Sequence, residues 1–342
     1  MTRISIPDDS PAVLAPSSVF PALEARADLD YHDTLPGTVD TLIERIGTAE
    51  VVLNIRSSSS FSERVFAACP NLRLLSLWGT GTDHVDLASA ARHGVTVTNT
   101  PGVSARSIAE HALALLFAVA RRLPEMDAAT RLGSWPRGRS VELYGKTCGV
   151  IGYGAIGRQF ARLAAAIGMR VIVWTMHPER YSGVEFVELD ELYRTSDVVS
   201  LHLRLSPATT DFIAAPQFAL MKPSAILVNT ARGAIVHQAA LWDALTNRRI
   251  SGAGLDVFAT EPLPQHHPLT LLSNVVLTPH CAGENQGRTL HHVAILRSLT
   301  KIGALKKGAP FARTVALPAA AARVVVFVQE NGHGRVQGVA AL

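Results

Sequence analysis

The sequence has few of the features that mark several large protein classes. It has only three cysteines, Cys69, Cys148 and Cys281, which are odd in number and far apart. This spacing excludes a disulfide scaffold and a CxxC metal knuckle, so we expect a cytoplasmic, reducing location and no metal site. The N-terminus has no signal-like apolar run, and the most apolar stretch, 111–120, is shorter than the ~20 residues of a spanning helix. We therefore expect neither export nor membrane insertion.

Charged residues are also scarce, at 18% of the 342 residues against 48% hydrophobic residues. A chain of this composition can bury a substantial core, which excludes disorder as its main state, and its length suggests about two domains. The net charge is only +4, and residues 284–342 carry eight Lys or Arg against two acids. Because the basic excess belongs to the C-terminal end, we expect no nucleic-acid partner.

Short apolar runs alternate with amphipathic segments over most of the chain. In the first hundred residues, strands are expected at 51–55, 72–77 and 95–98, and helices at 62–68 and 85–91. From residue 146 onward, strands are expected at 147–151, 170–174, 198–203, 225–229, 252–256 and 274–277, and helices at 156–167, 189–195, 216–221 and 236–247. This alternation predicts parallel sheets covered on both faces, with ligands at the carboxyl ends of the strands.

The longest helical signal, 104–122, lies between the two alternating regions. Ser104 is expected to cap its start, and two arginines in its last turn suit the helix dipole. Pro124 lies just beyond its end, and the glycines and prolines of 124–145 predict an irregular arm. The tail 319–342 contains an apolar, strand-like run but fits neither region, so its place stays open.

The most informative motif is the run CGVIGYGAIG, in which Gly152, Gly154 and Gly157 follow an apolar strand and open a helix. The first glycine permits a tight turn, the second lets the backbone approach a pyrophosphate, and the third allows close helix–strand packing. The helix N-terminus adds unpaired N–H groups and the positive end of its dipole. In this strand–turn–helix context, the motif predicts dinucleotide binding.

The sequence leaves the choice of dinucleotide open. An acidic residue is expected about 20 residues after the motif, at the end of the next strand, to hold the ribose hydroxyls. Thr175 stands there instead, followed by His177 and Arg180. A neutral residue removes the repulsion that would exclude a 2′-phosphate, but arginines after this strand are often only solvent-exposed. Both NAD and NADP therefore remain candidates.

Three later strands each lead into charged or titratable residues. Arg232 follows the first, Asp256 and Glu261 the second, and His280 the third. Arginine binds a planar carboxylate bidentately, and histidine exchanges protons with alcohols or ketones near neutral pH. A carboxylate bonded to the histidine would fix its tautomer. Beside a nicotinamide ring, this set of side chains indicates interconversion of 2-hydroxy and 2-keto acids.

The segments that carry these residues resemble the D-isomer-specific 2-hydroxyacid dehydrogenases, a family that includes phosphoglycerate dehydrogenase and glyoxylate/hydroxypyruvate reductase. The similarity runs from about Val51 to Pro318 and includes WGTGTDHVDL, NTPGVSARSIAEHALALL, GKTCGVIGYGAIG, SDVVSLHLRLSPATT, VNTARG, LDVFATEP and LTPHCAG. The resemblance implies an α/β fold of two doubly wound parallel sheets, with a Rossmann cofactor domain inserted into a flavodoxin-like catalytic domain. It assigns residues 1–101 and 286–318 to the catalytic domain and 102–285 to the NAD(P)-binding domain.

The resemblance also implies a role for each matched residue. His280 would be the general acid in reduction and the base in oxidation, Glu261 its partner, and Arg232 the ligand of the substrate carboxylate and carbonyl. Further substrate contacts would come from Ser57, Ser58, Trp78 and Gly79, through backbone N–H groups. Asp256 would meet the nicotinamide carboxamide. The other cofactor contacts would be Thr80, Gly152, Gly154, Ala155, Ile156, Gly157, Thr175, Leu203, Thr230, Ala231, His280 and Gly283.

The resulting expectation is hydride transfer between NAD(P)H and a small 2-keto acid, in a homodimer formed through the 104–122 helix and the 124–145 arm. Two alternatives stay open. Phosphite dehydrogenases use a similar Arg, Glu and His set, and the dinucleotide-sensing corepressors related to this family can retain the three residues without turnover. Formate oxidation is disfavoured, because formate dehydrogenases carry glutamine where this chain has Glu261.

Overall fold

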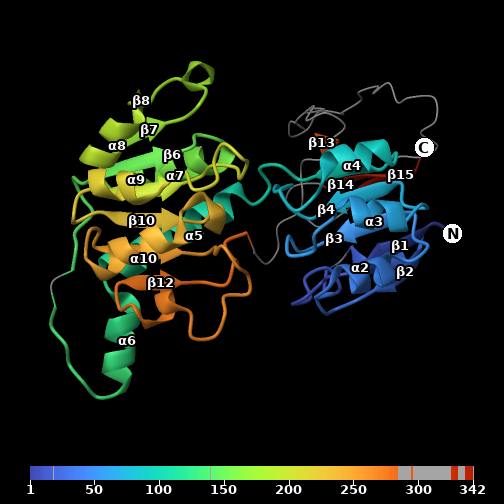
Figure 1. The fold of residues 1–342 in the computed structure, drawn as a ribbon, viewed down its shortest axis with the longest axis horizontal. Helices are drawn as coiled ribbons and strands as arrows, with labels where there is room; N and C mark the ends of the chain where they lie inside the picture. Colours follow the sequence, from blue (N-terminus) through green and yellow to red (C-terminus); the bar gives the residue numbers. More distant parts are fainter. Residues whose placement is uncertain (18, 139, 284–293, 296–324, 330–335, 342) are drawn as a thin grey trace. The chain divides into compact units, whose positions relative to one another are not determined.

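The computed structural model describes residues 1–283, 294–295, 325–329 and 336–341, apart from residues 18 and 139. The chain divides into two compact units, Met1–Val103 with Gln286–Leu342, and Ser104–Asn285. In each unit, helices pack against a largely parallel sheet (Figure 1). The expected α/β class with two parallel sheets is therefore confirmed.

The first unit is built on a sheet with the strand order β13-β5-β4-β3-β1-β2. Its five parallel strands follow the order 2-1-3-4-5 of flavodoxin-like folds, as expected, and β13 (Ala294–Ile295) joins antiparallel to β5. The parallel strands are β1 (Arg3–Ile6), β2 (Asp28–Tyr31), β3 (Val51–Asn54), β4 (Leu74–Leu77) and β5 (Thr96–Asn99). The helices are α1 (Phe20–Glu24), α2 (Val39–Ile46), α3 (Glu63–Ala68) and α4 (Leu87–Arg92).

The second unit holds an all-parallel sheet with the order β12-β11-β10-β9-β6-β7-β8. Numbered along the chain, this is the Rossmann order 3-2-1-4-5-6 with one further strand, so the order in which strands are added to the sheet reverses between β6 and β9. The strands are β6 (Thr147–Ile151), β7 (Arg170–Trp174), β8 (Glu185–Phe186), β9 (Val198–Leu201), β10 (Ile226–Asn229), β11 (Gly252–Leu255) and β12 (Val275–Leu277).

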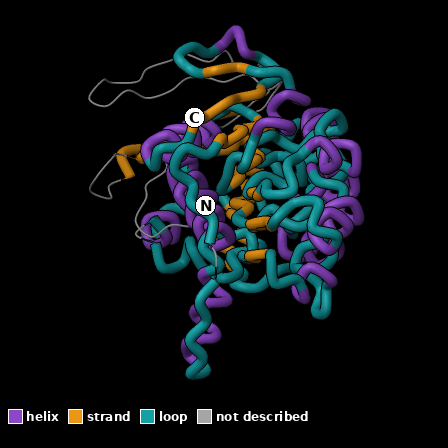
Figure 2. The backbone as a smooth tube through the Cα atoms, turned by 90° about the vertical axis from the view of Figure 1, so that its left-hand side faces the viewer, coloured by secondary structure: helices purple, strands orange, loops and turns teal. Residues whose placement is uncertain are grey.

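Two layers of helices enclose this second sheet, as Figures 1 and 2 show. On one face, α5 (Ala105–Ala120) and α7 (Ala155–Ala166) share an apolar cluster with the strands. On the other face lie α8 (Leu189–Thr195), α9 (Ala215–Leu220) and α10 (Gln238–Thr246). Short 3₁₀ turns occupy Pro178–Arg180, Gly233–Ile235 and Pro268–Leu271.

Small residues let α5 approach the sheet closely. Ala109 and Ala112 are fully buried on this helix. Across from them, a Cβ on Gly254 of β11 would lie 2.8 Å from Leu115 Cβ, and one on Gly252 would lie 2.9 Å from Val119 Cγ1. Because protein interiors pack as densely as crystals, the close approach of α5 requires small residues on β11, and the run GAGL supplies them.

The connection after α5 differs from the expected irregular arm. The long helix ends at Ala120, because Arg122 adopts the left-handed conformation (φ 53°), and a second helix, α6 (Leu123–Arg131), starts at once. Pro124 lies beyond the end of α5, as expected, but it also stands in the first turn of α6, where its fixed φ favours helix and its missing N–H costs nothing. Ser104 does occupy the N-cap position of α5, but its side chain makes no cap hydrogen bond.

The C-terminal expectations fall mostly outside the described residues. Of the expected catalytic-domain segment 286–318, the structure describes only β13. In the tail, β14 (Val325–Gln329) and β15 (Val336–Ala341) pair antiparallel, so the apolar run at its centre is a strand. None of the helices in the described part of the chain combines the length and the hydrophobicity of a membrane span. The cytoplasmic location stays a prediction.

Candidate active site

The candidate residues of the second unit gather at the carboxyl edge of its sheet. The glycine loop follows β6, Thr175 follows β7 and Leu203 follows β9. Thr230, Ala231 and Arg232 follow β10, Asp256 follows β11 and His280 follows β12. Because all these strands are parallel, residues that are far apart in the sequence end on one edge.

The glycine loop lies at the point where the strand order reverses. Gly152 has φ +94°, a conformation that side chains rarely adopt, and a Cβ there would lie 2.7 Å from the carbonyl oxygen of His202. A Cβ on Gly157 would lie 2.0 Å from the carbonyl oxygen of Gly152. The absence of a side chain at Gly157 therefore lets α7 pack closely against the turn after β6. Around Gly154, by contrast, a Cβ would meet no atom within 4 Å.

This arrangement fits a dinucleotide. Gly154 stands at the N-cap of α7, so the backbone N–H groups of the first residues, Ala155 and Ile156, have no partner within the helix and are available to an anion. Within the described part of the chain, the buried hydroxyl of Thr230 has no hydrogen-bond partner, so a ligand could supply one. Next to the loop, Leu203 Cδ2 lies 3.1 Å from where a Cβ of Gly152 would stand.

The residues after β7 favour neither NAD nor NADP. Thr175 is partly exposed directly after the strand, so no carboxylate stands at this position. His177 and Arg180, which follow, are not reserved for a phosphate, because Glu179 lies 3.5 Å from His177 Nδ1 and 3.6 Å from Arg180 Nε. These exposed contacts are weak and would exchange readily with a phosphate.

The Arg232 loop packs directly on the loop that carries Glu261. The side chain of Asn229 accepts a hydrogen bond from Ala231 N and donates one to Arg232 O, both at 3.0 Å, which fixes the turn. At Gly233, a Cβ would lie 1.9 Å from the carbonyl carbon of Phe258, so only glycine allows the two loops to touch. Arg232 itself donates from Nη1 to Ala231 O at 2.9 Å.

His280 and Glu261 form a direct pair. The imidazole Nδ1 lies 2.7 Å from Glu261 Oε2, while Glu261 Oε1 accepts a hydrogen bond from Phe258 N at 2.9 Å. The carboxylate thus holds the proton on Nδ1 and leaves Nε2 as the ring atom that can meet a ligand. Both side chains are about 30% exposed, so the pair can be reached from solvent.

The backbone of His280 adopts a left-handed conformation. Its φ is +53°, a left-handed conformation in which histidine, asparagine and aspartate are enriched among non-glycine residues. Its N–H donates to Asp256 O at 2.7 Å and also to Thr278 O at 3.1 Å. The turn after β12 therefore aims His280 by hydrogen bonds to the end of β11.

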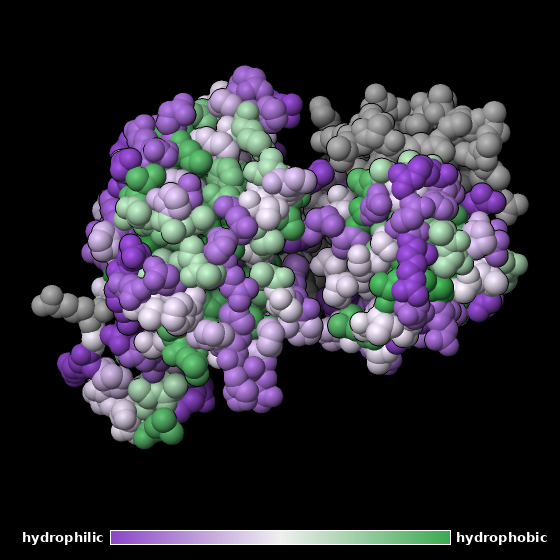
Figure 3. Space-filling view, viewed as in Figure 1, coloured by the Kyte–Doolittle hydropathy of each residue, from purple (hydrophilic) through white to green (hydrophobic). Residues whose placement is uncertain are grey.

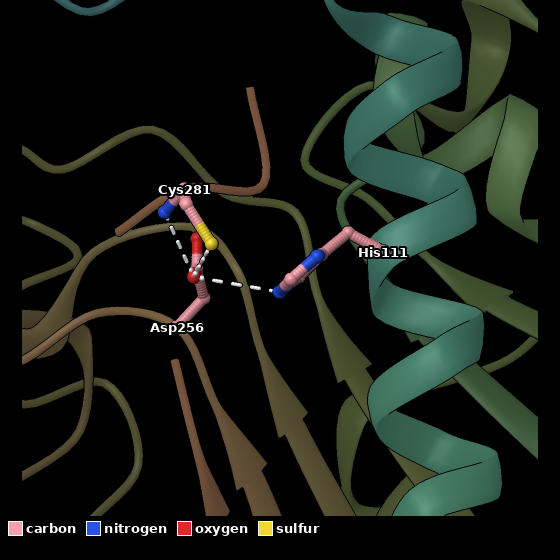
Figure 4. Close-up of side chains that lie close together, drawn as sticks. All are labelled: His111, Asp256 and Cys281. Atoms are coloured by element: carbon pink, nitrogen blue, oxygen red, sulfur yellow. Dashed lines mark hydrogen bonds and ion pairs between the residues drawn. The ribbon is translucent and has the colours of Figure 1, made fainter. Parts of the chain in front are cut away.

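Asp256 is buried and anionic. It accepts hydrogen bonds from Thr278 Oγ1 at 2.6 Å, Cys281 N at 3.0 Å and Ala282 N at 2.9 Å. Burial by itself raises the pKa of the Asp256 carboxyl, but hydrogen bonds from His111, Thr278 and the two backbone N–H groups outweigh burial and hold that pKa below its usual range. Figure 4 shows His111 reaching this carboxylate from α5.

The substrate candidates of the first unit lie at the carboxyl ends of two neighbouring strands. Ser57 and Ser58 form the turn after β3, and Trp78, Gly79 and Thr80 follow β4. Trp78 N already donates to Asn54 O at 2.8 Å, so the Gly79 N–H is the better candidate donor. Their assignment to substrate, and that of Thr80 to the cofactor, stays a prediction.

Sequence reasoning missed two positioning groups. Asp8 is buried beneath the turn after β3 and accepts hydrogen bonds from Asn54, Ile55 N and Ser59. Burial raises the pKa of Asp8 despite these bonds. His111 escaped notice because a single histidine within a helix forms no motif, and only the packing of α5 brings it to Asp256.

Comparisons with known proteins agree with this geometry. Residues 113–282 match the family model described as "D-isomer specific 2-hydroxyacid dehydrogenase, NAD binding domain". The chain is 40% identical to a glyoxylate reductase of Korarchaeum cryptofilum, over 80% of this chain and 86% of that protein. It is 41% identical to a D-3-phosphoglycerate dehydrogenase of Mycobacterium tuberculosis, over 78% of this chain and 51% of that longer protein. An acyclic imino acid reductase solved with NADPH and D-Arg superposes with a TM-score of 0.76 and 31% identity, over 84% of this chain and 91% of that one.

Proposed function

This chain belongs to the D-isomer specific 2-hydroxyacid dehydrogenase family, and on that premise we propose that it reduces small 2-keto acids such as glyoxylate or hydroxypyruvate. It is an NAD(P)-dependent oxidoreductase, as the match to the NAD-binding domain and the relatives indicate. The observation that carries the substrate class is the 2.7 Å pair of His280 and Glu261 on the same sheet edge as Arg232 and the glycine loop.

Each of the site residues has its own role in the proposed reaction. When bound, the reduced nicotinamide supplies the hydride. Arg232 binds the carboxylate of the keto acid through its planar guanidinium, which keeps its charge throughout. Protonated His280 faces the carbonyl oxygen with Nε2 and gives it a proton as negative charge develops there, and Glu261 holds the imidazole in place from the other side.

Asp256 has a separate role in this scheme. Its carboxylate is buried at the end of β11 and anionic, which suits it to accept a hydrogen bond from the amide group of a nicotinamide. The Thr230 hydroxyl and the N–H groups at the start of α7 supply further contacts along the same edge. With neutral Thr175 at the end of β7, we infer that both NADH and NADPH are accepted.

The experiment that tests this function is oxidation of NADH and NADPH, measured in parallel with purified protein. Glyoxylate, hydroxypyruvate, pyruvate and a phenyl-substituted keto acid serve as substrates, and phosphite with NAD or NADP serves as the competing donor. We expect turnover of at least one small 2-keto acid. Oxidation of phosphite alone, or tight cofactor binding with no turnover of any of these compounds, would replace the proposal with the phosphite or the sensor function.

The glycine loop gives a prediction that separates folding from cofactor binding. In Gly154→Ala, the new methyl group occupies open space at a backbone conformation that alanine adopts easily, so the unfolding temperature should stay within about 2 °C. Because that space would hold the pyrophosphate, we expect cofactor affinity to fall by a factor of ten or more. In Gly157→Ala, the Cβ would collide with the carbonyl oxygen of Gly152, so stability itself should fall.

Thermal unfolding without cofactor and fluorescence titration with NADH measure the two effects. A third variant, Gly145→Asn, changes a glycine with open space outside the loop, and asparagine tolerates its left-handed conformation (φ +71°), so cofactor affinity should stay unchanged. Unaltered NADH affinity in folded Gly154→Ala would remove the glycine loop from the cofactor site.

We also propose that the protein is a homodimer held by the segment from α6 to Tyr144. Leu132, Trp135 and Tyr144 are 84%, 76% and 76% exposed there, an unusual concentration of large apolar groups on one projecting segment. Figures 1 and 2 show α6 extending from the body of its unit, and Figure 3 shows apolar surface at its end. Sedimentation equilibrium should give twice the 36.5 kDa chain mass, and Leu132→Asp with Trp135→Ser should give the monomer.

A further inference from the structure

Three potential metal ligands from separate segments surround one carboxylate oxygen. His111 Nε2 lies 3.5 Å from Asp256 Oδ1, and Cys281 Sγ lies 3.7 Å from the same oxygen. The three ligand atoms lie within 4.8 Å of one another. Figure 4 shows the imidazole and the thiol both directed at the carboxylate, one from α5 and the other from the turn after β12.

These separations match a tetrahedral site. With metal–ligand bonds of about 2.0–2.3 Å, tetrahedral zinc separates neighbouring N, O and S ligands by roughly 3.3–3.7 Å. The separations of His111 Nε2 and Cys281 Sγ from Asp256 Oδ1 fall within this range or at its limit. Small side-chain rotations would bring the imidazole and the thiol, which lie within 4.8 Å of each other, to the same distance. A set of three protein ligands leaves the fourth position for water.

The surroundings of the carboxylate favour such a site. Asp256 is fully buried, and Ala282 N donates to its Oδ2, the kind of supporting hydrogen bond that fixes a metal ligand in place. Its Oδ1 accepts hydrogen bonds from Thr278 Oγ1 and Cys281 N, and the metal would take the place of the Thr278 hydroxyl. A thiol and an imidazole select zinc or cadmium over magnesium and calcium, which prefer oxygen ligands. No metal site was expected from the sequence, because the three cysteines lie far apart, whereas this ligand set comes from residues 111, 256 and 281.

We propose that His111, Asp256 and Cys281 form an inhibitory site for zinc, and that zinc bound there prevents cofactor binding. On binding, the Cys281 thiol releases its proton to solvent and the sulfur bonds to the metal. His111 Nε2, which faces Asp256 and Thr278 as a donor, gives its proton to solvent while Nδ1 takes one up, so that the Nε2 lone pair is free to bond to the metal. No group is oxidised or reduced. Exclusion of the cofactor rests on the proposed function, in which Asp256 contacts the nicotinamide, and on Cys281 being the direct neighbour of His280.

Binding is tested first, without any reference to turnover. Cobalt(II) is titrated as a spectroscopic substitute for zinc, and we expect one equivalent to produce a thiolate-to-cobalt absorption band that zinc removes. Cys281→Ser should lose this band although it keeps Cys69 and Cys148, and His111→Gln should bind cobalt at least tenfold more weakly. His266→Asn, which changes an exposed histidine outside the cluster, should behave as the wild type.

Thermal unfolding of each variant without metal confirms that the variant is folded. If Cys281→Ser does not fold, Cys281→Ala replaces it in the cobalt titration. A band that persists without Cys281, or the absence of any band in the wild type, would overturn the site.

Competition is then measured with the wild type. Zinc should raise the apparent dissociation constant of NADH in a fluorescence titration in proportion to its concentration, and a chelator should reverse the effect. Magnesium should do nothing, and Cys281→Ser should need at least tenfold more zinc. A cobalt band with unchanged NADH affinity would keep the site and overturn the inhibition. Because both measurements use binding alone, they are independent of whether the protein turns over a 2-keto acid.

Discussion

Replacing His280 with asparagine is expected to lower kcat for 2-keto acid reduction by about 10²–10⁴ while leaving NADH affinity within about twofold of the wild type. Asparagine keeps the turn intact, because it tolerates the left-handed conformation that His280 adopts at φ +53°. It cannot carry a proton to the carbonyl oxygen. The loss should therefore fall on the chemical step and not on the fold or the cofactor.

Steady-state kinetics and NADH titration measure the two quantities separately. The matched control is His266→Asn, which places asparagine at another left-handed histidine, φ +65°, away from the Glu261 pair. It should retain wild-type turnover. A folded His280→Asn protein with more than a tenth of the wild-type kcat would falsify the assignment of His280 as the proton donor.

Replacing Arg232 with lysine is expected to lower kcat/KM by about 10²–10³, although the positive charge is retained. A guanidinium binds a carboxylate through two parallel hydrogen bonds, whereas an ammonium group binds as a point charge. Loss of a charge-assisted bidentate contact costs about 3–4 kcal/mol, which corresponds to this factor. The turn itself should survive, because Asn229 fixes it through the backbone of Ala231 and Arg232.

The control for this variant is Arg249→Lys, in an exposed pair with Asp243 in the same unit. It should change kcat/KM by less than twofold, since exposed ion pairs contribute little. The Arg232 variant should also lose discrimination between a keto acid and its amide, because the group that recognises the carboxylate is impaired. If Arg232→Lys keeps kcat/KM within threefold of the wild type, the substrate carboxylate is bound elsewhere.

Local patterns in the sequence were sufficient for much of this site. The apolar runs before Gly152, Arg232, Asp256 and His280 are strands, and parallel strands bring residues at their carboxyl ends to one edge. That rule needs no knowledge of side-chain contacts, which is why it placed these residues correctly. The glycine loop could also be predicted from the sequence, because its tight turn, its open space and its close contact with the helix each depend on the absence of a Cβ.

The prediction of an irregular arm over 124–145 was wrong for residues 124–131, which belong to α6, and the reason is local. Pro124 indicates a helix end when it follows a helix and a helix start when it stands in the first turn, and the sequence does not distinguish the two. The left-handed Arg122 decides the matter, since it ends α5 and allows α6 to begin.

The sequence by itself therefore determined the alternation of strands and helices, the glycine loop and the strand-end positions of the residues to which we assign the chemistry. Those features follow from apolar periodicity, from the absence of side chains at glycines and from the direction of parallel strands. Only the tertiary structure decided that Glu261 lies 2.7 Å from His280, and that His111 and Cys281 meet at Asp256. These contacts depend on how α5 packs on the small residues of β11 and on how the turn after β12 is tied to β11. Such packing is set by many side chains at once and leaves no signal in any single stretch of sequence.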